Sequence, residues 1–163
     1  MNAPPSLLGS SAAPGEPEQT LVRCLVGPRP EHQARDELSD VLRRLGQTDE
    51  LFEAELAVNE LVTNAHQHAP APYELRISWS ETSVKIAVMD GGADHDVLLK
   101  LLSQAPNCGP THEDSGRGLQ MVAGLFGGRC GAEPTTTSAG NAPAKQVWIV
   151  LSRRYRLPEG GRR

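Results

Sequence analysis

Two alternating apolar runs, residues 73–80 and 83–89, are separated only by Glu81 and Thr82, and this pattern restricts the fold more than any other part of the chain. Period-two alternation is typical of a strand with one buried face, and a two-residue connection joins antiparallel neighbours. The apolar residues of the two runs are Tyr73, Leu75, Ile77, Trp79, Val84, Ile86 and Val88. The chain therefore has to build an antiparallel hairpin and cover one of its faces.

Two segments before the hairpin have helical periodicity and supply that cover. The first starts near Pro30, a residue favoured in the first helical turn, and ends at Gly46. The second runs from about Asp49 to His68 and stops before Pro70. Apolar residues recur in both at three- or four-residue spacing: Ala34, Leu38, Val41, Leu42, Leu45, Leu51, Ala54, Val58, Leu61, Val62 and Ala65. We expect both helices to pack on the sheet.

The rest of the chain is predicted to add strands to the sheet and a third helix to the two that cover it. Strands are predicted at 20–26, weakly at 129–133 and strongly at 146–151, and GRGLQMVAGLF begins a third helix that stops at Gly127. We expect VLLKLL to form a short turn and PTTTSAGNAPA to form a loop between the last two strands. The predicted fold is an α/β two-layer sandwich, with a mixed, mainly antiparallel sheet covered on one face by three helices.

The length of the chain and the composition of its two ends predict a single domain. The chain has 163 residues, which suits one core. Residues 1–19 are rich in Pro, Ser, Ala and Gly and are expected to form a flexible leader. Residues 20–152 are expected to form the domain, and residues 153–163 a basic tail.

Charge and apolar patterning exclude several classes of protein. With a formal net charge of −4, the chain lacks the excess of basic residues that is typical of a nucleic-acid-binding protein. No apolar run approaches the ~20 residues that cross a bilayer, and no basic start precedes an apolar stretch at the N-terminus. Three cysteines without a CxxC pair indicate neither a disulfide framework nor a zinc site. We expect a cytoplasmic protein that contacts neither nucleic acid nor membrane.

Glu60 and Asn64 are the first candidates for chemistry, because they lie four residues apart on the second predicted helix. This spacing places their side chains one above the other, about 6 Å apart along the helix axis. A carboxylate and an amide oxygen suit Mg²⁺, which takes one or two protein oxygens and leaves its other positions to water and phosphates. A solvated helix face is the alternative interpretation of the pair.

Two glycine-rich turns supply further candidates. Asp90 ends a strand and is followed by Gly91 and Gly92, so a ligand can approach the backbone beside a carboxylate that accepts a hydrogen bond from an exocyclic amine. An ordinary Asp-Gly turn is the alternative. The GRGL sequence at 116–119 opens a helix, where free backbone N–H groups favour phosphate. The absence of GxGxxG and of a Walker lysine disfavours two other common nucleotide-binding folds.

In their order along the chain, NELVTNAHQHA, VMDGG and SGRGLQMV resemble the N box and the two glycine boxes of the GHKL (histidine-kinase-like) ATPases. This superfamily contains gyrase, a heat-shock chaperone, mismatch-repair proteins and histidine kinases, and its two-layer architecture is the Bergerat fold. The short length and the form NELVTNAxxHA look most like its anti-sigma-factor serine/threonine kinases. The likeness covers about residues 20–151.

The resemblance implies a role for each matching residue. Asn64 would hold the Mg²⁺ that bridges the phosphates of ATP, and Glu60 would be the catalytic base or would orient the attacking hydroxyl or water. Asp90 would read the adenine amine, and residues 95–115 would form a lid over the nucleotide. The other positions implied to bind the cofactor are His68, Gly92, Gly116, Arg117, Gly118, Leu119 and Gln146.

Some positions depart from the family pattern. Asp94 stands where the first glycine box normally has its last glycine, which adds a negative charge near the nucleotide. AKQVW puts Gln146 in the place of a threonine that helps the adenine-reading Asp in the subgroup. Glu113 and Asp114 would repel a triphosphate unless they face solvent, and Arg117 is the nearest compensating charge.

The resemblance leads to one main functional hypothesis and two alternatives. The main one is an ATP-binding regulatory kinase that sequesters a sigma factor and phosphorylates an anti-anti-sigma partner, with a homodimer left open. A non-catalytic protein-interaction module with a degenerate ATP pocket is the alternative. The ATPase half of a two-component histidine kinase ranks last, because no phosphoacceptor-helix domain fits before residue 30.

Overall fold

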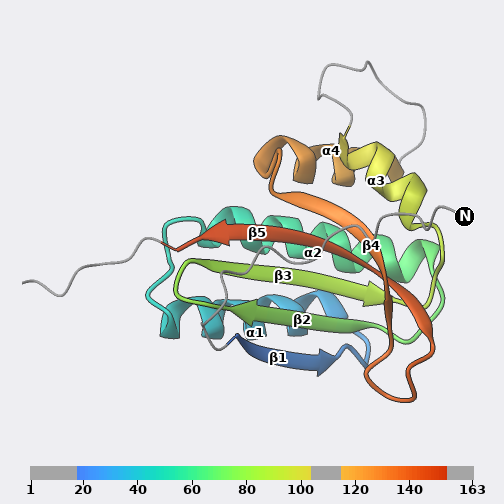
Figure 1. The fold of residues 1–163 in the computed structure, drawn as a ribbon, viewed down its shortest axis with the longest axis horizontal. Coiled ribbons are helices and arrows are strands. Elements are labelled where there is room, and N and C mark those ends of the chain that lie inside the picture. Colours follow the sequence, from blue (N-terminus) through green and yellow to red (C-terminus); the bar gives the residue numbers. More distant parts are fainter. Residues whose placement is uncertain (1–17, 104–114, 154–163) are drawn as a thin grey trace, which may run out of the picture.

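The computed structural model describes residues 18–103 and 115–153, in which a five-stranded sheet carries helices on one face (Figure 1). The strand order is β1-β2-β3-β5-β4, and all four neighbouring pairs are antiparallel. The strands are β1 Gln19–Cys24, β2 Glu74–Trp79, β3 Ser83–Asp90, β4 Cys130–Thr136 and β5 Pro143–Ser152. The helices are α1 Pro30–Arg44, α2 Leu51–His68, α3 His95–Ser103 and α4 Ser115–Leu125. The two-layer α/β sandwich is confirmed.

Two details of the predicted architecture are corrected. The described sheet is wholly antiparallel rather than mixed, since each pairing runs in opposite directions. VLLKLL forms most of a fourth helix, α3, rather than a turn, because Leu98 and Leu102 are four residues apart and both reach the core. Residues 104–114, the centre of the expected lid, lie outside the described residues, as do residues 1–17 and 154–163.

The last two strands are longer than the sequence pattern indicates. PTTTSAGNAPA was expected to be all loop, but β4 continues to Thr136 and β5 already begins at Pro143. Ladder pairing extends to Thr136 opposite Pro143, so the polar composition of this stretch was misleading. Tertiary pairing overrides weak local preference here.

The core lies between the sheet and the helices, and the predicted apolar stripes are confirmed. Pro30 occupies the first turn of α1, and α2 stops before Pro70, as their sequence positions predict. Side chains from all four helices and from four of the strands meet in one cluster that includes Leu38, Leu42, Val58, Leu61, Leu75, Ile77, Ile86, Leu102, Leu119, Val122, Phe126, Ile149 and Leu151. No helix in the described part of the chain is long and apolar enough to span a membrane.

The register of β3 against β5 determines which polar side chains share a face. Asp90 pairs with Lys145, and Met89 pairs with Gln146. Because successive residues alternate between faces, Asp90 and Lys145 lie on the helix-covered side with Val88 and its partner Val147. Gln146 therefore lies on the opposite face of the sheet.

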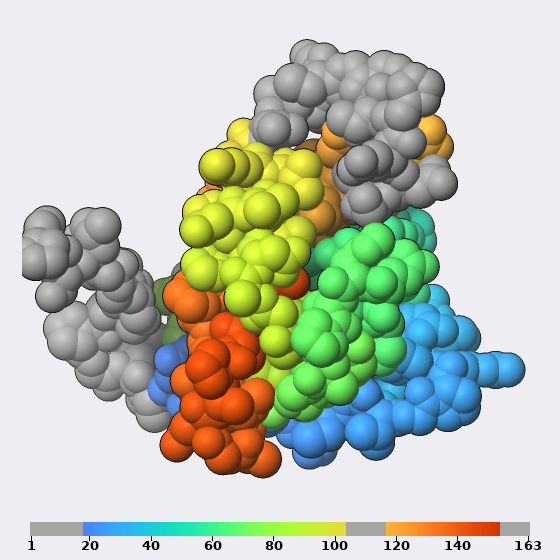
Figure 2. Space-filling view, turned by 90° about the vertical axis from the view of Figure 1, so that its right-hand side faces the viewer, coloured from blue at the N-terminus to red at the C-terminus, as the bar shows by residue number. Residues whose placement is uncertain are grey.

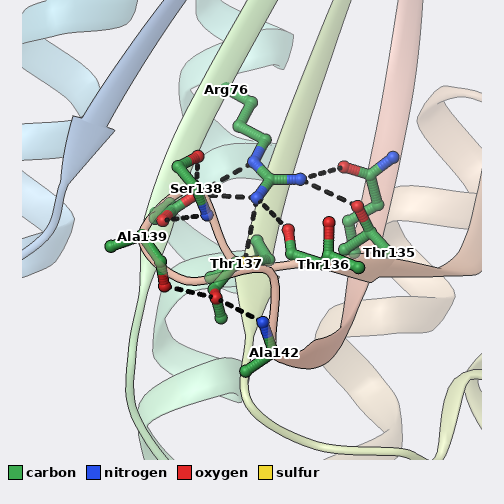
Figure 3. Close-up of polar contacts among 10 residues, drawn as sticks. Arg76, Thr135, Thr136, Thr137, Ser138, Ala139 and Ala142 are labelled. Carbon is green, nitrogen blue, oxygen red and sulfur yellow. Dashed lines mark hydrogen bonds and ion pairs between the residues drawn. The ribbon is translucent and has the colours of Figure 1, made fainter.

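A polar network crosses that opposite face (Figure 3). The Arg76 guanidinium donates to the buried Glu74 carboxylate at 2.8 and 3.0 Å, to Thr135 Oγ1 at 2.9 Å and to the Thr136 carbonyl oxygen. Glu74 also accepts from the backbone N–H and the hydroxyl of Ser138. These bonds attach the β4–β5 connection to the sheet.

Candidate functional site

One face of α2 lines a small pocket at the N-terminal end of α4. Glu60, Thr63, Asn64, Gln67 and His68 recur at three- and four-residue spacing, which places them on one side of a helix. Gly118 and Leu119 of α4 complete the lining, and the pocket has a volume of about 40 Å³. Glu60 and Asn64 are half-buried, so their oxygens can reach a ligand while remaining partly hydrated.

The backbone of Gly118 lies directly against the Glu60 side chain. A Cβ placed at Gly118 would overlap the Glu60 carboxylate oxygen and lie 3.1 Å from its carboxyl carbon. Only a glycine leaves room for this approach. The close packing of α4 on α2 thus holds the Glu60 carboxylate beside the first turns of a helix, where backbone N–H groups and the helix dipole favour an anion.

The pocket residues fit Mg²⁺ and phosphate by their chemistry. Glu60 and Asn64 present one carboxylate and one amide oxygen on a single side of the pocket, which is the kind of oxygen set that a mostly hydrated Mg²⁺ accepts. Gly118 and Leu119, in the first turns of α4, line the same pocket. Cation-binding oxygens and an anion-accepting helix end therefore line one pocket.

A second polar cluster lies where β3 ends. Asp90 is buried and accepts a hydrogen bond from the Gly92 N–H at 2.8 Å. The Lys145 ammonium lies 3.3 Å from the Asp90 carboxylate and also donates to Asp94, which directly precedes α3. Figure 2 views this end of the molecule, with α3 in yellow above the orange-red β4–β5 hairpin and the green residues around the end of α2.

The two carboxylates of this cluster have opposite pKa shifts. Burial raises the pKa of Asp90, although the Gly92 N–H and the Lys145 ammonium act in the other direction. Partial burial also acts to raise the pKa of Asp94, but the hydrogen bond and the charge of Lys145 outweigh it, and the pKa lies below its usual value. Asp94 is therefore the carboxylate that the lysine holds firmly in its ionised form.

Backbone packing fixes the end of α2 relative to the end of β3. The Gly91 N–H donates to the Pro70 carbonyl oxygen at 2.8 Å, and a Cβ at Gly91 would lie 2.5 Å from the Ala71 carbonyl oxygen. The Tyr73 hydroxyl donates to the Ala69 carbonyl oxygen at 2.7 Å. These contacts keep the helix face that carries Asn64 and the strand end that carries Asp90 in a constant relation.

Most of the predicted site residues lie at these two clusters. Glu60, Asn64, His68, Gly118 and Leu119 line the pocket, and Asp90 and Gly92 form the second cluster with Lys145. Gly116 lies in the first turn of α4. Arg117, beside it, is exposed and is outside the set of described residues that line the pocket.

Gln146 lies at neither cluster, and the expectation that it stands beside Asp90 is corrected. It donates to Glu133 at 2.7 Å on the open face of the sheet. The residue opposite Asp90 is Lys145, one position earlier, and a shift of one residue in a strand moves a side chain to the other face.

Two residues were missed by the sequence reasoning, and a signal existed for each. Thr63 lies three positions after Glu60 and lines the same pocket, as helical spacing predicts. Lys145 lies an even number of residues before Val147, Ile149 and Leu151, which are buried, and therefore on the same face of β5. The apolar alternation of that strand, continued toward its start, therefore placed a lysine on the buried face.

The fold and the pocket define an α/β sandwich domain in which a Glu–Asn pair on one helix and the first turns of another helix line the same pocket. A family model described as the histidine kinase-like ATPase domain matches residues 27–128, more than half of the chain. The chain belongs to this family. Membership supports ATP binding, and Mg²⁺ is the usual metal ion in such domains. No curated protein matches the sequence. The matched range contains Glu60, Asn64 and Asp90 and ends before β4 and β5.

Proposed function

We propose that this protein is an ATP-binding regulatory kinase of the anti-sigma-factor type, which sequesters a sigma factor and phosphorylates an anti-anti-sigma partner on serine or threonine. The observation that carries the proposal is the pocket itself. In it, Glu60 and Asn64 of α2 share one lining with Gly118 and Leu119 near the N-terminus of α4. Family membership supports the choice of ATP.

Each side of the pocket has a task in phosphoryl transfer. Asn64 holds Mg²⁺, which supplies charge neutralisation for the ATP phosphates when bound. The backbone N–H groups at the start of α4 bind phosphate oxygens. Asp90 accepts a hydrogen bond from the adenine amine, and Gly92 lets the base approach the backbone.

Glu60 is the base in the proposed reaction. It takes the proton of the partner's hydroxyl group while the hydroxyl oxygen forms a bond to the γ-phosphorus. The bond from that phosphorus to the β–γ bridging oxygen breaks, and ADP leaves. The half-buried position of Glu60 beside Gly118 suits a carboxylate that has to remain accessible to an incoming side chain.

The first test is ATP binding by calorimetry, with and without Mg²⁺. Asn64→Ala and Asp90→Asn are expected to abolish or greatly weaken binding. Asn59→Ala, the same change in the same helix but outside the described pocket lining, is the matched control and should bind like the wild type. Wild-type protein that binds no ATP would refute the proposal.

The second test concerns the kinase step and the partners. Purified protein is mixed with a candidate sigma factor or with an anti-anti-sigma protein and γ-labelled ATP. We expect complex formation with the first and label transfer to the second, and Glu60→Ala should lose the transfer while retaining nucleotide binding. Failure of both reactions with cognate partners would overturn the assignment.

A second candidate function is a non-catalytic interaction module with a degenerate ATP pocket. The specific observation in its favour is that Asp90 already has a cationic partner within the protein, Lys145. Mg²⁺-dependent ATP binding at submicromolar concentration would decide against this alternative.

A further inference from the structure

Lys145 is the most deeply buried charged residue among those the structure describes, with 1% of its surface exposed. Lysine is almost never fully buried unless it is paired, because desolvation of the ammonium is costly. Its partners are the carboxylates of Asp90, at 3.3 Å, and Asp94. The proposed function assigns a task to Asp90 but none to the lysine.

The three charged groups converge on Gly92. A Cβ at that glycine would lie 2.9 Å from Asp90 Oδ1, 3.0 Å from Lys145 Nζ and 3.2 Å from Asp94 Oδ1. In the proposed function, this is where the base lies against the backbone and its amine donates to Asp90. The ammonium therefore stands where the amine of the base would stand.

The charges of Asp94 and Lys145 also compensate one another. Asp94 adds a negative charge next to the base position, and Lys145 adds a positive charge that binds it. The cluster as a whole keeps the single negative charge that Asp90 would have alone. Lys145 comes from β5, outside the range that the family model matches, and Asp94 comes from the loop before α3.

We propose that Lys145 lowers the affinity of the nucleotide site, because its ammonium competes with the nucleotide base for Asp90 and has to be displaced before a purine amine can bind there. The inference rests on the proposed function, because it concerns the same nucleotide site. Asp94, which already binds the ammonium, retains it after displacement, so the lysine gives up one of its two partners and keeps a counter-charge. Binding of the base is weakened by the contact that it replaces.

A substitution cycle tests this competition with Mg²⁺-ATP as the probe. The variant that carries both Lys145→Thr and Asp94→Gly removes the competitor and the extra charge together. We expect it to bind ATP roughly tenfold to a hundredfold more tightly than the wild type, the factor that corresponds to one hydrogen bond between charged groups. Asp94→Gly alone leaves the ammonium to Asp90 and should not tighten binding.

Two controls separate the base position from other effects. Lys85→Thr removes another lysine of the sheet, ion-paired with Glu133 on the open face, and should leave the dissociation constant unchanged. Inorganic tripolyphosphate has no base, so all variants should bind it with the affinity of the wild type. Thermal unfolding without nucleotide reports the cluster independently: Lys145→Thr alone leaves two carboxylates together and should unfold at a lower temperature than the double variant.

The possible failures are distinguishable. Equal ATP affinity in the folded wild type and the folded double variant overturns the role of Lys145 and leaves the proposed function intact. Weaker ATP binding by the double variant also overturns it, since Lys145 would then contact the nucleotide favourably. Absence of ATP binding in both folded proteins overturns the proposed function and this inference together.

Discussion

Gly118→Ala tests whether the packing of α4 on α2 positions the Glu60 carboxylate. The new methyl group would overlap the carboxylate oxygen and lie 3.1 Å from the carboxyl carbon, whereas ordinary carbon contacts begin at about 3.5 Å. Since the obstacle is the end of a flexible side chain, the carboxylate moves, by about 1 Å, and the backbone stays. A displacement of about that size at a reacting group costs roughly 100-fold in rate.

The same substitution should leave stability almost unchanged. Replacing a helical glycine with alanine gains about 0.5 to 1 kcal/mol, and forcing the Glu60 side chain away from its rotamer costs about 0.5 to 1.5 kcal/mol. We therefore expect a free energy of unfolding within about 1 kcal/mol of the wild type. Loss of phosphoryl transfer without loss of folding is the signature of displaced Glu60.

Gly124→Ala is the matched control, because Gly124 lies in the same helix and a Cβ added there would meet nothing within 4 Å. It should keep full activity and gain about 0.5 to 1 kcal/mol in stability. Label transfer from ATP gives the rate, urea unfolding gives the stability, and the side-chain carboxyl resonance of Glu60 reports its displacement without turnover. Wild-type rate and an unshifted resonance in Gly118→Ala would refute the reasoning.

Three further predictions concern backbone packing, the polar network on the open face of the sheet and the core. Gly91→Ala should lower the free energy of unfolding by about 1 to 3 kcal/mol in urea, because its Cβ would lie 2.5 and 2.9 Å from backbone oxygens that cannot retreat; wild-type stability would contradict this packing. Burial acts to raise the pKa of Glu74, but hydrogen bonds from Arg76 and Ser138 outweigh burial and hold this pKa below its usual value. The ionised carboxylate therefore stabilises the fold above about pH 4.3, and that stabilisation is lost as the pH falls. Glu74→Gln should cost about 2 to 4 kcal/mol at pH 7 and flatten the pH dependence of unfolding below about pH 5; an unchanged slope would argue against the network. Phe126→Ala, at a core residue with 1% of its surface exposed, should cost about 3 to 5 kcal/mol in thermal unfolding, and a smaller loss would mean that the neighbouring side chains collapse into the space.

Local periodicity accounts for what could be predicted. The face of α2 that carries Glu60, Asn64 and His68 follows from the 3.6-residue turn of a helix, and the hairpin of β2 and β3 follows from alternation around Glu81 and Thr82. Both depend only on residues close together in the chain. The same reasoning applied to β5 would have found Lys145, whereas counting from a family motif led to Gln146.

Contacts between residues far apart in the sequence could not be predicted from local periodicity. Nothing near Gly118 in the sequence indicates that its backbone lies against Glu60, 58 positions earlier, since that approach depends on how α4 packs on α2. Likewise, the attachment of Ser138 to Glu74 depends on the β4–β5 connection folding back over the sheet.

The sequence by itself determined the elements, the faces that they bury and the helix surface that carries Glu60 and Asn64, because backbone geometry relates neighbouring residues in a fixed way. Only the tertiary structure decided that Lys145 joins Asp90 and Asp94 above Gly92. That cluster requires the register of β3 against β5 and the path of the chain into α3, both of which are selected by packing the whole core.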